Sequence, residues 1–154
     1  DQGRDVAPLV ELQAALFGRQ ETRRLTTAGF SRKTGLSAAD VSDLCRRRLL
    51  IPLEDGRFDA QDVALGRLLA KGLQLGIAPA DLDFYPRLAA EIVDHEMRLR
   101  NQHTRDMGFE QDAGVTLELT GIARSLRAYV IDRTMQRELI RYQGLKPEKA
   151  APLE

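Results

Sequence analysis

Basic side chains gathered in one stretch are the residues of this sequence with the clearest chemistry to offer. The run Arg46-Arg47-Arg48 follows Arg32 and Lys33, and Arg57 comes soon after it. Between residues 23 and 57 there are eight basic and four acidic side chains, a local charge of +4 in a chain that is neutral overall. Guanidinium and ammonium groups are suited to phosphate oxygens. Phosphate contacts are therefore predicted at Arg32, Lys33, Arg46, Arg47 and Arg57.

Each of these basic residues also has a plainer interpretation. Arginines at the end of a helix complement the helix dipole without any ligand, and an arginine in a turn can simply be solvated. Both interpretations stay open for the run at 46–48 and for Arg57. The neutral total charge, with 23 basic and 23 acidic residues, argues against a protein that coats nucleic acid non-specifically.

The other reactive residues do not form a catalytic or metal-binding set. Cys45 is the only cysteine, so an internal disulfide and a multi-cysteine zinc site are excluded, and the thiol is interpreted as a side chain beside the core. His95 and His103 could bind a metal across a dimer, but a histidine in a coiled-coil seam more commonly sets the register. The sequence has no nucleophile–histidine–carboxylate set and no glycine-rich phosphate loop. We therefore expect no enzyme activity, no metal and no cofactor.

The composition is that of a globular protein. Of its 154 residues, 43% are hydrophobic and 30% are charged, which supplies enough apolar material for a packed core. No apolar run has the length of a membrane span, so no membrane partner is expected, and no signal-peptide pattern opens the sequence. A single cysteine fits a reducing compartment, which predicts a cytoplasmic location. Because the first residue is Asp and not Met, we interpret the chain as a piece of a longer protein.

The basic stretch is predicted to fold as two short helices joined by a glycine-containing turn. A helix over residues 27–33 places Phe30 inward. Ser37, with Asp40 three residues later, caps a second helix that runs from residue 38 to about residue 47. This arrangement is typical of a helix-turn-helix.

An apolar hook and a third helix complete the predicted unit. Residues 49–53 are predicted to be extended because Pro52 cannot continue a helix, and residues 54–57 form a tight turn in which Asp-Gly supplies a positive φ. A helix capped by Asp59 runs to about residue 75, and a short helix opens at Pro79. The core is predicted to consist of Phe30, Val41, Leu44, Leu50, Phe58, Val63 and Leu68.

Two long helices are predicted after Pro86, over residues 87–105 and 115–142, with a loop over 107–114. Apolar residues recur in them at intervals of four and three, which is the spacing of a coiled-coil seam. The residues predicted to form a dimer interface are Leu88, Ile92, His95, Leu99, Leu119, Ile122 and Leu126. The expected organisation is an N-terminal helix (5–19) and linker within 1–24, a helix-turn-helix domain over 25–85, a long helical hairpin or dimerisation region over 86–144, and a frayed tail over 145–154.

Five short motifs follow one another along the chain from residue 34 to residue 77. They are Thr34-Gly35-Leu36-Ser37, Leu49-Leu50-Ile51-Pro52, Gly56-Arg57-Phe58, Asp62-Val63 and Leu75-Gly76-Ile77. In order and spacing they resemble the MerR family, and the resemblance covers about 60 of the 154 residues.

This resemblance implies a mainly α fold, in which a winged helix-turn-helix domain is followed by long antiparallel, coiled-coil-like dimerisation helices. It implies a homodimeric transcriptional regulator on double-stranded DNA with an inverted-repeat operator, and an effector whose nature the sequence does not give. It also adds Ser37 and Ser42 to the residues predicted to bind DNA.

The residues that would read DNA depart from the family pattern. Where the family carries an Arg followed by two Tyr, this chain has Ser42, Asp43 and Leu44, and Arg48 stands where the family has Gly. These departures favour an alternative, a degenerate winged helix that serves as a protein-interaction or oligomerisation module without sequence-specific DNA binding. A third interpretation, a phage-type excisionase or DNA-packaging adaptor, shares the wing but not the long coiled coil.

Overall fold

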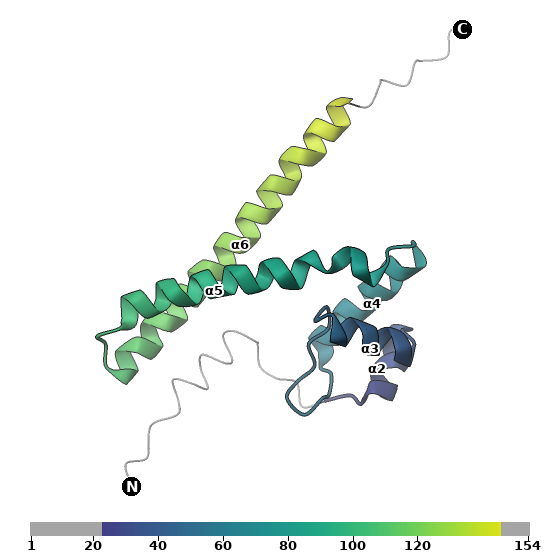
Figure 1. The fold of residues 1–154 in the computed structure, drawn as a ribbon, viewed down its shortest axis with the longest axis horizontal. Coiled ribbons are helices and arrows are strands. Elements are labelled where there is room, and N and C mark those ends of the chain that lie inside the picture. Colours follow the sequence, from purple (N-terminus) through teal and green to yellow (C-terminus); the bar gives the residue numbers. More distant parts are fainter. Residues whose placement is uncertain (1–22, 146–154) are drawn as a thin grey trace. The chain divides into compact units, whose positions relative to one another are not determined.

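A computed structural model describes residues 23–145 of the chain (Figure 1). The helix predicted over 5–19 and the tail beyond residue 145 lie outside the described residues. Within 23–145 the chain forms helices and no strand, which confirms the mainly α fold class. The elements are α2 (Thr27–Thr34), α3 (Ala38–Arg46), α4 (Ala60–Gln74), the 3-10 helix η1 (Pro79–Leu82), α5 (Phe84–Thr104) and α6 (Phe109–Leu145).

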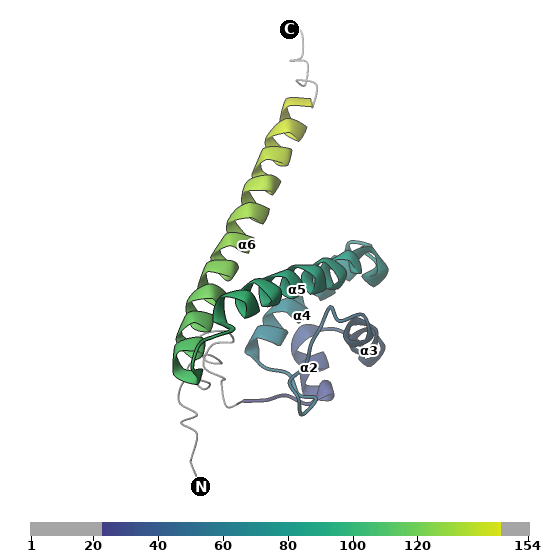
Figure 2. The same ribbon diagram turned by 60° about the vertical axis from the view of Figure 1, so that its left-hand side comes forward.

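The described residues belong to two compact units, 23–102 and 103–145. The first holds α2, α3, α4, η1 and nearly all of α5, and the second holds α6. In the first unit α2 packs against both α3 and α4, and the three short helices form one cluster in both ribbon views (Figure 2).

Local capping contacts explain why α2 and α3 begin and end where they do. Gly35, in the left-handed conformation at φ 81°, ends α2, and its N–H donates to the carbonyl of Ser31. Ser37 and Asp40 then form a reciprocal capping box at the start of α3, with each side chain accepting from the other residue's backbone N–H at 3.1 Å. The predicted turn and cap are therefore confirmed.

The core of the first unit lies between α2, α3, α4 and the segment that joins α3 to α4. Its buried hydrophobic residues are Phe30, Leu36, Val41, Leu44, Leu50 and Phe58. The rings of Phe30 and Phe58 stack with their centroids 4.2 Å apart, so the core is built around an aromatic pair.

Of the seven residues predicted to form the core, five are buried, one is half-buried and one is exposed. Val63 is half-buried and packs against the core, whereas Leu36, which the prediction lacked, is buried in the turn before α3. Leu68 is 64% exposed. The prediction failed at Leu68 because α4 has apolar residues on two faces, and only the face with Val63, Gly66 and Leu69 contacts this core.

The segment between α3 and α4 closes a tight turn but does not form paired strands in the described chain. The N–H of Leu53 donates to the carbonyl of Arg57 at 2.9 Å, and Gly56 takes a positive φ of 73°, as the Asp-Gly pair predicts. Phe58 pairs with Leu25 in a single antiparallel bridge. The bridge anchors this turn to the chain just before α2.

Two boundaries predicted for the long helices were wrong. The first long helix begins at Phe84 and not after Pro86, because a proline in the first helical turn lacks only an N–H that has no intrahelical acceptor. The second begins at Phe109, inside the predicted loop, with Glu110 and Asp112 in a first turn that favours acidic side chains. Gly114 lies within this helix and does not interrupt it.

Candidate nucleic-acid interface

The first half of α3 presents short side chains to solvent. Ala38, Ala39 and Ser42 are exposed, while Val41 and Leu44 point into the core. The hydroxyl of Ser37 accepts from the N–H of Asp40 and donates to its carboxylate at 2.6 Å. The hydroxyl of Ser37 is thus occupied in capping α3. Of the two serines predicted to bind DNA, Ser42 is the one whose exposed side chain does not take part in this cap.

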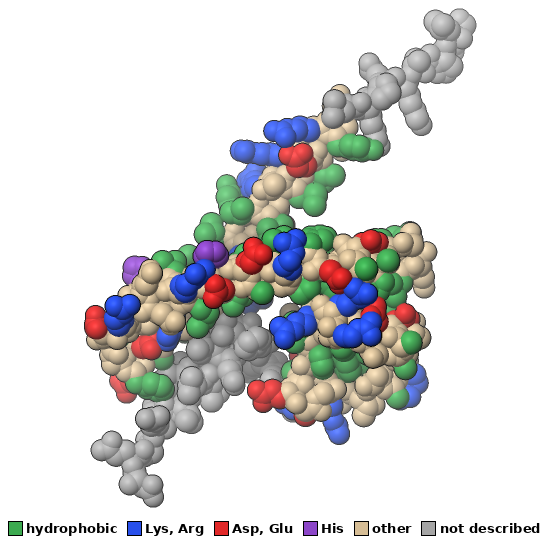
Figure 3. All heavy atoms as spheres, in the orientation of Figure 1, with side chains coloured by type: hydrophobic (Ala, Val, Ile, Leu, Met, Phe, Trp, Pro, Cys, Tyr) green, Lys and Arg blue, Asp and Glu red, His purple; other side chains and the backbone are tan. Residues whose placement is uncertain are grey.

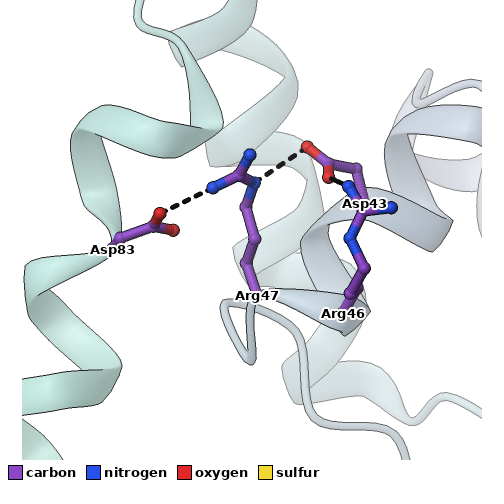
Figure 4. Close-up of polar contacts among 4 residues, drawn as sticks. All are labelled: Asp43, Arg46, Arg47 and Asp83. Carbon is purple, nitrogen blue, oxygen red and sulfur yellow. Dashed lines mark hydrogen bonds and ion pairs between the residues drawn. The ribbon is translucent and has the colours of Figure 1, made fainter.

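The basic end of α3 is tied to two carboxylates. Arg47 donates through Nε to Asp43 at 3.0 Å and through Nη1 to Asp83 at 2.6 Å (Figure 4). Arg46 pairs with the same Asp43 from the other side. The hydrogen bond to Asp83, and next the one to Asp43, raise the pKa of Arg47 further above its already high ordinary value. Arg47 therefore links α3 to the residue that precedes α5.

This network changes how the predicted phosphate contacts are interpreted. The side chain of Arg47 is only 27% exposed, whereas that of Arg46 is 73% exposed. The charge of Asp43, which would repel phosphate from α3, is balanced by two guanidinium groups. The sequence did not predict this link because Asp83 lies 36 positions beyond Arg47.

The other predicted basic residues are exposed to solvent. Arg32 and Lys33 occupy the last turn of α2, and Arg57 follows the tight turn. Within the described chain, none of the three has a carboxylate at ion-pair distance. Their positive charges are available to a phosphate backbone in a way that the charge of Arg47 is not.

The turn that carries Arg57 is held by Asp55. Its carboxylate accepts from the guanidinium of Arg24 at 2.9 Å and from the backbone N–H of Arg57 at 3.1 Å. The hydrogen bond from Arg24, followed by that from Arg57, lowers the pKa of Asp55. The turn is thereby fixed to the chain entering α2, a contact that the sequence pattern did not predict.

The residues predicted to form a dimer interface lie on the surface of α5 and α6. Leu88, Ile92 and Leu99 of α5 are exposed, as are Ile122 and Leu126 of α6, and Leu119 is half-buried. Figure 3 shows hydrophobic side chains interspersed with charged ones along α6. His95 bonds to the guanidinium of Arg98 at 3.0 Å on its own helix. No cluster of metal-ligating side chains is found among the described residues.

Cys45 is half-buried next to the core. Burial raises the pKa of its thiol, and the nearby charge of Asp62 raises it further. Burial also raises the pKa of Asp62 itself. A thiol with a raised pKa has less of the reactive thiolate, so the environment of Cys45 is that of a packing residue.

No protein-family model matches this chain, and no curated protein has significant similarity to it. Over residues 23–145, every helix is too short or too polar to cross a membrane.

Proposed function

We propose that this protein is a homodimeric transcriptional regulator that binds double-stranded DNA as a winged helix-turn-helix of the MerR type. The observation that carries the proposal is the capped nine-residue helix α3, whose first half faces solvent behind a fixed glycine turn. Reading the major groove requires a rigid helix with an exposed N-terminal half. The turn around Gly56 would serve as the wing.

The phosphate contacts are assigned to Arg32, Lys33 and Arg57, with Arg46 as a fourth. These side chains are exposed and come from α2, the turn and the end of α3. Ser42 offers a single hydroxyl to a base edge or phosphate and cannot make the two-pronged contact of an arginine to guanine. Operator choice then depends more on half-site spacing and DNA bending than on base contacts.

Dimerisation is assigned to the seams of α5 and α6. A two-fold axis through these helices would fix the spacing of two recognition helices, which accounts for an inverted-repeat operator.

A second candidate is a protein-interaction module built on the same helices. The network at Asp43 favours it, because an acidic residue stands on the helix that should face phosphate and Arg47 is already engaged. The two candidates differ in one measurable property, the dependence of DNA affinity on salt.

The test is a salt titration of DNA affinity on a duplex from upstream of the protein's own gene. Replacing Lys33 or Arg57 by Ala removes one released counterion each, so the slope of log affinity against log salt should fall by about one per variant. Arg47→Ala is the matched control. Because Arg47 is held by Asp43 and Asp83, this variant should lower thermal stability but leave the slope within error of wild type.

The outcomes separate the two functions. If no duplex binds at low salt, or if all variants share one slope, DNA binding is wrong and the interaction module is favoured. If Arg47→Ala lowers the slope as much as Lys33→Ala does, the assignment of Arg47 as a structural link is wrong.

A further inference from the structure

An apolar groove of about 730 Å³ lies on the first unit, and its lining includes none of Ala38, Ala39 and Ser42 of α3. Its walls come from α4, the end of α3 and the segment after it, η1 and the first turns of α5. All of its lining residues are apolar or glycine except Arg48 and Tyr85. This volume falls within the range of small-molecule sites in proteins.

The groove has the core residue Leu44 at its base, and part of its lining lies outside the core. Its lining residues Ile51 and Leu68 are 72% and 64% exposed, and the buried core forms without them. Scattered exposed leucines need no explanation, but a continuous apolar hollow indicates a binding site.

Arg48 is the one charged residue that lines the groove. It takes a φ of 58°, and it is the only non-glycine residue of the described chain with a positive φ. The left-handed conformation is strained for an L-residue with a side chain, and within the described residues no carboxylate lies at ion-pair distance from Arg48. A strained residue with no compensating partner is a reason to look for function.

We propose that this groove binds an amphipathic monoanion of the fatty-acid class. The acyl chain lies along the apolar walls formed by α4 and α5, and the carboxylate pairs with the guanidinium of Arg48, with the hydroxyl of Tyr85 as the second polar group. A charge-assisted pair between guanidinium and carboxylate supplies orientation and selectivity, and the apolar walls supply affinity.

Charge complementarity favours this ligand over a helix from a second copy of the chain. The apolar seams that α5 and α6 could offer carry His95, Gln102, Arg133 and Gln136 at their polar positions, and no carboxylate. The nearest carboxylates of such a helix, Glu91 on α5 and Glu118 on α6, flank the seams and do not lie in them, and Arg133 adds a second cation. A single carboxylate on an apolar chain satisfies both the walls and the cation.

The test is isothermal titration of the full chain with dodecanoate and with dodecan-1-ol, each below the concentration at which it self-associates. Dodecanoate should bind at one site per chain and about tenfold more tightly than the alcohol. Shortening either ligand should weaken its binding by about fourfold per methylene. Arg48→Gly should remove the preference for the acid while leaving the alcohol unaffected, because glycine fits the backbone conformation of Arg48.

Two further variants complete the design. Leu68→Gln, at an exposed position, should weaken both ligands without unfolding the protein, and Arg32→Ala, remote from the groove, should change neither. The proposal is overturned if wild type binds neither ligand saturably, if acid and alcohol bind equally, or if Arg48→Gly keeps the preference for the acid. It is also overturned if Leu68→Gln converts a dimer to a monomer, since a second copy would then occupy the groove. None of these readouts involves DNA, so the proposal stands or falls independently of DNA binding.

Discussion

Arg48 takes a backbone conformation that its own side chain disfavours. Its N–H donates to the carbonyl of Cys45 at 3.0 Å, and this contact closes the end of α3 with a left-handed residue. Glycine is the usual residue in such a position. The backbone is therefore strained at the C-terminal end of α3.

Replacing Arg48 by Gly should stabilise the protein. Relief of the left-handed strain contributes about 1–2 kcal/mol, and the greater freedom of glycine in the unfolded chain offsets about 0.5–1 kcal/mol of it. We expect a net gain of about 0.5–1 kcal/mol in the free energy of unfolding, measured by urea denaturation. Arg46→Gly, at a helical position two residues earlier, should instead lose stability. A loss at both positions would mean that the side chain of Arg48 makes contacts that outweigh its strain.

The two faces of α4 give this helix two tasks. Val63 and Gly66 face the core, Leu65 and Leu68 line the groove, and Leu69 contacts both. Gly66 is buried, and a Cβ added there would lie 2.6 Å from the ring of Phe30 and 2.7 Å from the methyl carbon of Thr34. Its lack of a side chain sets how closely α4 approaches α2.

Gly66→Ala should therefore destabilise the protein even though alanine is the better helix former. Overpacking against an aromatic ring costs about 1–3 kcal/mol, which exceeds the helix-propensity gain of about 1 kcal/mol. Gly72→Ala, on the same helix, is the control, because its nearest neighbour would be an Ile77 carbon at 3.8 Å. Thermal melts should show a lower Tm for the first variant and an equal or higher Tm for the second. A stabilised Gly66→Ala would contradict the close approach of α4 to α2.

Features that depend on residues close in sequence were predicted well, and features that depend on contacts between separate elements were not. The caps at Ser37 and Asp59 were predictable because each acts within three residues of itself. The starts of α5 and α6 were not, because Pro86 and Gly114 have a different meaning in a first turn and inside a long helix. The partnership of Arg47 with Asp83 and the groove around Leu68 depend on how separate elements meet, which periodicity does not specify.

At the level of the whole molecule, the described residues of the long helices carry much exposed apolar surface. No described residue of α6 is buried, although this helix has 37 residues. The seam residues Leu88, Ile92 and Leu99 are likewise exposed on α5. Burial of this surface against a second copy would stabilise the chain.

The protein should therefore be a dimer in light scattering, with twice the 17.2 kDa mass of one chain. Ile92→Glu places a charge in the seam and should shift the measured mass toward that of a monomer. Asn101→Glu, on the opposite side of α5, is the matched control and should remain dimeric. A wild-type mass that stays at one chain at every concentration would rule out the dimer.

The aromatic residues of this chain determine which spectroscopic signals can follow its folding. The chain has no tryptophan, and its three tyrosines, Tyr85, Tyr129 and Tyr142, are each about 60% exposed. Unfolding then changes their surroundings little, so intrinsic fluorescence is nearly silent to folding, and helix content in the far ultraviolet is the better signal. Because no tryptophan masks tyrosine emission, tyrosine fluorescence should respond to a ligand that binds beside Tyr85 in the groove. It should respond likewise to changes around Tyr129 and Tyr142 on α6.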